Sequence, residues 1–188
     1  MKNMYWLLGL FVGLLFMTGC GKEENANNKV QLGSFSTKSP NAEVTKDDFI
    51  YRLVSEKKEY NKEEVVKLYA ELEYIGEQEE ITIYHAMSPF YFPIEEKIRG
   101  FIIHYPMAEP LITRTLVKGE PFREEYKGSG AYSPEDGKDY VKFMESFIEN
   151  GFPTGYYVVN GSADFFVGDA DEEKENYHME AQVDFKVY

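Results

Sequence analysis

Cysteine is almost absent from this sequence, and its scarcity limits how the protein can be stabilised. Cys20 is the only cysteine among 188 residues, so no intramolecular disulfide can form. The sequence also contains no cysteine-based metal motif and no cofactor-binding motif, and we expect no cofactor. Stability must therefore come from a packed apolar core.

Basic residues are also few, and the imbalance excludes one class of partner. The chain carries 20 Lys and Arg against 33 Asp and Glu. Beyond residue 19, 19 basic and 33 acidic side chains remain, a net charge of −14, because only Lys2 is lost. A surface this acidic is repelled by phosphate backbones and anionic head groups. We therefore expect no nucleic-acid partner.

Long apolar runs are absent except at the N-terminus. Lys2 precedes an uncharged stretch over residues 5–17, which is followed by Thr18, Gly19 and Cys20. This arrangement resembles the signal of bacterial lipoproteins, in which a small residue directly precedes the cysteine. The resemblance implies cleavage between Gly19 and Cys20, a diacylglycerol thioether on the Cys20 thiol and a further acyl chain on its amine. Two or more chains give a stable anchor.

Two other interpretations of the same segment stay open. Residues 3–21 lack charge and approach the length of a membrane-spanning helix, so an uncleaved anchor is an alternative. A chance cysteine after an apolar run is the other. The absence of any other cysteine favours lipidation, because an exported domain then has a single thiol reserved for lipid. We predict a lipid-anchored protein on the extracytoplasmic face of the cell membrane.

The remaining chain divides into a polar segment and one domain. Residues 20–45 are rich in Asn, Lys, Glu, Ser and Gly, which is typical of a flexible tether. Residues 46–188 are long enough for a single domain and rich in aromatic residues. We therefore predict a signal peptide over 1–19, a lipidated tether over 20–45 and a folded domain over 46–188.

Alternating apolar residues predict β-strands through most of this domain. The clearest run covers residues 66–74, and residues 81–85 follow after a short acidic turn, which indicates a hairpin. A helix over residues 61–75, with Asn61 as its cap, is a competing interpretation of the same run. Further strands are predicted over 49–54, 88–94, 101–105, 111–117, 122–126, 156–159, 163–167 and 179–187.

One segment has helical rather than alternating periodicity. Within residues 138–150, Tyr140, Phe143, Met144, Phe147 and Ile148 fall on one face, and glycine follows the segment. Short strands separated by turn residues, with one amphipathic helix inserted, predict a mainly β protein with an antiparallel β-sandwich.

A family resemblance agrees with this prediction. It is carried by residues 71–74 with 81–83, by the Leu116 to Glu120 step and by the Gly155 to Val159 strand. These segments resemble immunoglobulin-like domains of bacterial envelope lipoproteins and are distantly similar to Bacillus-type proteinase inhibitor domains. The resemblance implies an immunoglobulin-like sandwich and identifies no functional residues.

No group of residues in the sequence matches a catalytic or metal site. The three histidines, His85, His104 and His178, lack metal-ligand spacing, and His85 and His104 are interpreted as ordinary half-buried side chains of strands. Ser129 lacks the glycine that a nucleophile elbow needs two residues before it. The acidic loop over residues 169–173 lacks the glycine of a calcium-binding loop and is interpreted as solvated.

Two functional classes remain. The many tyrosines, among them Tyr91, Tyr105, Tyr126, Tyr132 and Tyr156, could form a binding face, although core packing is the simpler role for each. We therefore predict a noncatalytic module that binds an envelope protein or polymer. The alternative is an envelope hydrolase with a carboxylate pair, which would need a concave pocket and two carboxylates of opposed proton affinity.

Overall fold

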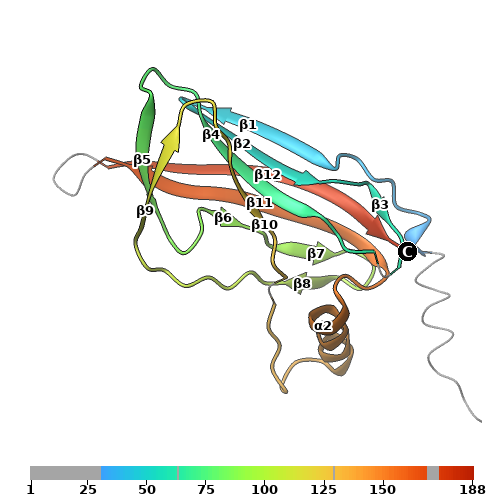
Figure 1. The fold of residues 1–188 in the computed structure, drawn as a ribbon. Helices are drawn as coiled ribbons and strands as arrows, with labels where there is room; N and C mark the ends of the chain where they lie inside the picture. The colour runs from blue at the N-terminus through green and yellow to red at the C-terminus, as the bar shows by residue number, and fades with distance from the viewer. Residues whose placement is uncertain (1–30, 63, 129, 169–173) are drawn as a thin grey trace, which may run out of the picture.

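Two mainly antiparallel sheets pack face to face in the computed structural model, which describes residues 31–62, 64–128, 130–168 and 174–188 (Figure 1). The first sheet has the order β1 (Asn41–Lys46), β2 (Phe49–Ser55), β4 (Leu68–Tyr74) and β10 (Phe122–Glu125). The second has the order β3 (Glu59–Tyr60), β12 (Glu175–Val187), β11 (Gly155–Val167), β5 (Glu80–His85) and β9 (Ile112–Val117). The predicted mainly β sandwich is confirmed.

Three short strands continue the second sheet along the edge of β11 that also pairs with β5. Strands β6 (Phe90–Tyr91) and β7 (Ile94–Glu96) pair with β11, and β8 (Phe101–Ile103) pairs with β7. The hairpin of β11 and β12 is the longest element, with 13 residues in each strand. At about 3.3 Å per residue, each strand is about 40 Å long.

Alternation along the strands separates a buried face from an exposed face. In β2, Phe49, Tyr51 and Leu53 are buried between the sheets, and the residues between them face outward. The sheets approach closely at Gly161 of β11, where a Cβ atom would lie 2.8 Å from the Leu53 side chain and from the Tyr51 hydroxyl. Glycine is therefore required there for close packing.

The strand prediction for residues 66–74 is confirmed, and the helical alternative is wrong, because Leu68–Tyr74 forms β4. The predicted hairpin between this strand and residues 81–85 is also wrong. Strand β4 pairs with β2 and β10, whereas β5 pairs with β9 and β11 in the other sheet. The acidic turn thus crosses between the sheets, since alternation fixes the buried face of a strand and not its partner.

The predicted boundary of the tether is corrected in the described part of it. Residues 41–46 form β1, Leu32 is fully buried, and Phe35 stacks on Tyr156 with ring centroids 4.6 Å apart. The Asp184 carboxylate accepts hydrogen bonds from the Ser39 and Lys38 amides at 2.7 and 2.8 Å. These contacts hold residues 31–40 on the sandwich, and composition alone did not reveal them.

The predicted helix over residues 138–150 is confirmed as α2 (Lys138–Asn150). Phe143, Met144 and Phe147 are buried, as expected, but Ile148 is 58% exposed, so its predicted packing is wrong. The helix ends at Gly151, which has a φ of 80° and donates its amide to the Phe147 carbonyl. No helix within the described ranges is long and apolar enough to cross a membrane.

Candidate functional site

A cavity of about 500 Å³ lies where the β11–β12 hairpin meets β5 and β6. Its lining combines aromatic rings with several titratable groups, as ligand pockets commonly do. The lining residues come from β1, β5, β6, β11, β12 and the segment before β9: Lys46, Tyr84, His85, Ala86, Tyr91, Glu109, Pro110, Leu111, Asp164, Phe165, Phe166, Asn176, Tyr177 and His178. We refer to this cavity as the groove.

Asp164 and His178 form a polar chain at the groove. The two carboxylate oxygens of Asp164 contact different partners: Ser162 Oγ donates to Oδ2 at 2.6 Å, and His178 Nδ1 lies 2.5 Å from Oδ1. On its other side, His178 Nε2 lies 3.2 Å from the Glu180 carboxylate. The hydrogen bond to Asp164, and next that to Glu180, raise the pKa of His178 above its ordinary value. An imidazolium satisfies this geometry best, because both its nitrogens donate.

Aromatic rings flank this polar chain. Tyr84 of β5 and Phe166 of β11 stack with centroids 5.0 Å apart, and Lys174 Nζ lies 4.7 Å from the Phe166 ring centre. Burial and the nearby Asp164 charge raise the pKa of Tyr91. The Tyr91 hydroxyl is thus neutral near pH 7, and it can donate or accept a hydrogen bond.

His85 contributes a polar atom without a partner. Only 4% of this residue is exposed, and its Nδ1 lies 2.7 Å from the Ala86 carbonyl oxygen. Because a carbonyl only accepts, Nδ1 carries the proton. Burial is the main cause that lowers the pKa of His85, so the ring is neutral and Nε2 is a hydrogen-bond acceptor. Among the described residues, Nε2 has no hydrogen-bond partner.

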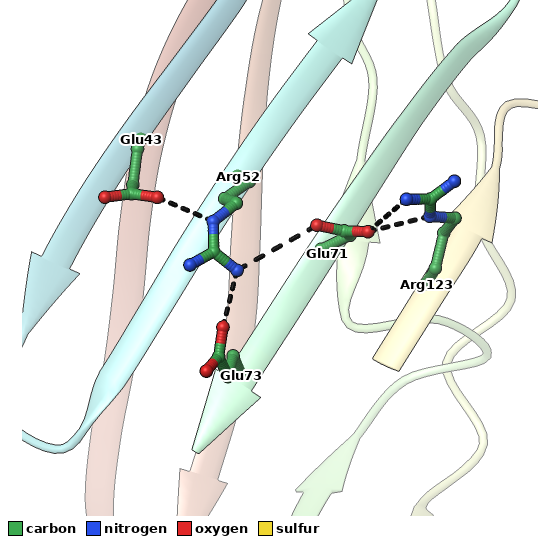
Figure 2. Close-up of polar contacts among 5 residues, drawn as sticks. All are labelled: Glu43, Arg52, Glu71, Glu73 and Arg123. Carbon is green, nitrogen blue, oxygen red and sulfur yellow. Dashed lines mark hydrogen bonds and ion pairs between the residues drawn. The ribbon is translucent and has the colours of Figure 1, made fainter. Parts of the chain in front are cut away.

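A second cluster of charges lies on the outer face of the first sheet (Figure 2). Arg52 of β2 lies 2.6 Å from both Glu43 of β1 and Glu73 of β4, and Arg123 of β10 lies 2.5 Å from Glu71 of β4. Each carboxylate thus faces a guanidinium group on a neighbouring strand. The network ties four strands together, so we interpret it as structural cross-strand pairing.

Glu96 is the most deeply buried carboxylate of the described chain, with no exposed surface. Its oxygens accept hydrogen bonds from the Ile98 and Arg99 amides at 3.0 and 2.8 Å, and the Arg99 guanidinium lies 3.3 Å away. Both carboxylate oxygens of Glu96 thus accept hydrogen bonds from residues two and three positions further along the chain. Glu96 therefore stabilises the connection between β7 and β8 and is not placed to act on a ligand.

The three histidines have different environments. His85 and His178 both line the groove, whereas His104 is exposed just after β8. Sequence reasoning missed the pairing of Asp164 with His178, although the two residues lie directly opposite each other in the β11–β12 register. An estimate of the hairpin register across the loop could have found it.

The tyrosines are also divided between different roles. Tyr105 and Tyr126 pack against each other and against Phe92, and the Tyr156 hydroxyl donates to Asp184 at 2.6 Å. Of the five tyrosines singled out as a possible face, only Tyr91 lines the groove. Tyr105 and Tyr126 therefore act as packing residues.

Several predicted residues lie outside the described part of the chain. They are Gly19 and Cys20, Ser129 and the acidic loop over residues 169–173. Within the described residues, no group of three or more His, Cys, Asp or Glu side chains could hold a metal ion. Comparison with protein-family models, with curated proteins and with solved structures gave no match. Function must therefore be argued from the geometry of this chain.

Proposed function

We propose that this protein is a lipoprotein on the extracytoplasmic face of the cell membrane, and that its sandwich is a noncatalytic binding module. Lipids on Cys20 anchor it, and its partner is an envelope protein or polymer rather than nucleic acid. The immunoglobulin-like character of the sandwich belongs to this proposal. The observation that carries the binding role is the groove, in which charged and aromatic groups converge in one cavity.

The position of the groove supports this proposal. Residues 31–40, which follow the proposed anchor in the sequence, lie beside the C-terminus at one end of the sandwich. Strand β5, the end of β11 and the start of β12 lie at the other (Figure 1). Tyr156 and Asp164 are eight residues apart on β11, which is about 26 Å. The groove thus lies at the end of the sandwich away from residues 31–40, which favours access to material beyond the membrane surface.

The bonding pattern favours binding over catalysis. Ser162 donates its hydroxyl proton to Asp164, and the His178 ring faces carboxylates rather than a hydroxyl. In the common serine nucleophile the hydroxyl donates to a histidine, whereas both ring nitrogens of His178 are occupied by carboxylates. One observation favours the hydrolase alternative, namely that Asp164 and Glu180 both contact His178 and so form a carboxylate pair beside a cavity.

Lipid anchoring can be tested by labelling cells with a radioactive fatty acid. We expect the wild-type chain to incorporate label and to remain in the membrane fraction, while Cys20→Ser does neither and accumulates as an unprocessed precursor. Label in the Cys20→Ser protein would refute the anchor.

Binding and hydrolysis can be separated with the lipidated protein in detergent micelles and purified envelope material. We expect Asp164→Asn to reduce retention of this material, with no soluble product released over time by the wild type. Time-dependent release that disappears in both Asp164→Asn and Glu180→Gln would instead support the hydrolase. Glu145→Gln, an exposed change on α2 that removes the same charge, is the control.

A further inference from the structure

Another cavity, of about 550 Å³, lies at the end of the sandwich where residues 31–40 meet the C-terminus (Figure 1). Lys57 and Lys58 reach it from the segment before β3, and Lys186 from the end of β12. The Ser36 hydroxyl and the Glu59 carboxylate also line it. Because three ammonium groups face one carboxylate, this cavity, which we call the basal cavity, has a positively charged lining.

The ammonium groups of the basal cavity are only partly neutralised by the protein itself. Lys58 is exposed and forms no ion pair with a described residue, whereas Lys57 pairs with Glu64 outside the lining. The stem of Lys186 is buried, and its Nζ lies 4.0 Å from Glu59 Oε1, which is too far for a hydrogen bond. Lysine ammonium groups and a hydroxyl donor together suit phosphate oxygens.

A cluster of acidic residues lies at the opposite end of the sandwich. The turn between β1 and β2 adjoins the crossing from β4 to β5 there, since the Ile75 amide donates to the Asp48 carbonyl at 2.8 Å. These two connections carry four carboxylates and no basic side chain: Asp47, Asp48, Glu77 and Glu79. The seven residues of β2 separate this turn from the basal cavity by about 23 Å, whereas salt screens charges over about 8 Å. The net negative charge of the chain therefore does not cancel the local charge of the cavity.

The basal cavity also lies close to the proposed lipid anchor along the chain. Cys20 and Gln31 are 11 positions apart, so they can be separated by no more than about 40 Å. Residues 31–40 are held on the domain, and Ser36 of this segment lines the cavity. A connection this short gives the cavity a high effective concentration of lipid head groups.

We propose that the basal cavity binds the phosphate groups of anionic membrane lipids, so that this end of the sandwich rests on the membrane. This inference rests on the proposed function, because the lipids on Cys20 bring the cavity to the membrane. Lys58 and Lys186 supply positive charge, and the Ser36 hydroxyl donates a hydrogen bond to a phosphate oxygen. Lipid is favoured over dissolved phosphate because the anchor keeps head groups beside the cavity. The groove, at the opposite end, then faces away from the membrane.

Chemical modification of lysines in the lipidated protein tests this proposal. An acetylating reagent modifies each lysine at a rate that mass spectrometry measures, in vesicles of phosphatidylcholine or of phosphatidylcholine and phosphatidylglycerol in equal parts. We expect Lys58 to react about fivefold or more slowly in the anionic vesicles, which is the factor that attraction of one lysine to an anionic surface supplies. Lys118 should react equally in both, because it is exposed at the opposite end, where its amide donates to the Glu79 carbonyl.

Two variants test whether the lysines of the basal cavity act together. Lys58→Gln should reduce the protection of Lys57 in anionic vesicles about fivefold, because one attracting charge is lost. Lys118→Gln removes the same charge from an exposed position at the opposite end and should leave this protection unchanged. Circular dichroism of each variant confirms that it is folded. Unchanged protection of Lys57 in Lys58→Gln would contradict the proposal.

Inorganic phosphate added to the phosphatidylcholine vesicles distinguishes the two sources of phosphate. Protection of Lys58 by dissolved phosphate, as strong as in anionic vesicles, would overturn the commitment to lipid. Equal reactivity of Lys58 in the two kinds of vesicle refutes the membrane contact. If Cys20 carries fatty-acid label and only this protection is missing, the proposed anchor stands and the present inference alone is wrong. If Cys20→Ser carries the label as well, the anchor is wrong and this inference fails with it.

Discussion

His178 is the residue whose charge state the structure constrains most clearly. Its side chain contacts two carboxylates, and both contacts favour the protonated ring. The contact with Asp164 is the larger cause of the raised pKa. Because the pKa is higher in the folded chain than in the unfolded one, the stabilising contribution is complete below the unfolded value and is lost as pH rises through the folded value.

This leads to a titration prediction. In NMR spectra, the His178 ring should titrate above the ordinary midpoint of about 6.5, and Asp164→Asn should move the midpoint downward. Glu180→Gln should move it less, because Glu180 is the second cause and lies 3.2 Å away rather than 2.5 Å. The same midpoint in wild type and Asp164→Asn would show that the two side chains do not interact in solution.

Gly161 lies at a close approach between the sheets, and its replacement should be costly. An alanine Cβ would lie 2.8 Å from Leu53 Cδ2 and from the Tyr51 hydroxyl, and both side chains are fully buried. We expect Gly161→Ala to lower the free energy of unfolding by about 1–3 kcal/mol, which is typical of overpacking. Denaturant titration measures it.

Gly137 provides the matched control, because a Cβ there has no heavy atom within 4 Å. Gly137→Ala should therefore change stability much less than Gly161→Ala. Equal losses for the two variants would mean that the Gly161 effect arises from the backbone rather than from the contact between sheets.

At the scale of the element, α2 packs on the sandwich through fewer residues than its periodicity suggests. Phe143, Met144 and Phe147 are buried. The rings of Phe101 and Phe152 pack against this face, with centroids 5.3 Å from Phe143 and 5.1 Å from Phe147. The helix therefore completes the aromatic core near β8. Ile148 lies at the border of the apolar face and remains in solvent.

The energetic prediction for α2 follows from this burial. Phe147→Ala should lower the free energy of unfolding by about 3–5 kcal/mol, because it empties a buried aromatic site. Ile148→Ala and Lys142→Ala should each change it by about 0.5 kcal/mol or less, since both positions are exposed. A loss at Ile148 as large as that at Phe147 would contradict the exposed position of Ile148.

At the scale of the whole molecule, residues 31–40 are part of the folded unit. Asp184 accepts hydrogen bonds from the Lys38 and Ser39 amides and from the Tyr156 hydroxyl, and its own amide donates to the Ser39 carbonyl at 3.0 Å. Burial and the bond to Asp184 raise the pKa of Tyr156 above its usual range. The described residues 31–40 are thus held on the domain by buried polar contacts.

Truncation of the chain should show how much residues 31–41 contribute to stability. A chain covering residues 42–188 should fold into a β-rich domain but be about 2–4 kcal/mol less stable than one covering residues 31–188. It lacks the buried Leu32 and leaves the Asp184 carboxylate, which is only 5% exposed, without its two amide donors. Denaturant titration of the two chains measures the difference.

A point variant and its control check that the stability lost on truncation comes from packing. In the chain covering residues 31–188, Leu32→Ala should cost about 2–5 kcal/mol, because Leu32 is fully buried. The neighbouring Gln31 is exposed, and Gln31→Ala should cost about 0.5 kcal/mol or less. Equal stability of the two truncated chains would refute the structural role of residues 31–41.

The sequence by itself determined the local structure of most elements. Alternation in Phe49, Tyr51 and Leu53 predicted a strand with one buried face, and the spacing of Phe143 and Phe147 predicted a helix with the observed bounds. These patterns depend only on the geometry of a strand or a helix, so they can be read without knowing any neighbour. The excess of acidic over basic residues can also be read from the sequence, and it disfavours nucleic acid as a partner.

Only the tertiary structure decided which strands pair and which polar groups meet. The turn after Tyr74 crosses between sheets because β2 and β10 occupy both edges of β4, and no local pattern encodes that competition. Asp164 meets His178 only through the register of a 13-residue hairpin, and Asp184 meets Ser39 across 145 positions of chain. The rest of the groove lining comes from β1, β5, β6 and the segment before β9, whose packing against the hairpin no local pattern encodes, and so the groove could not be found from the sequence.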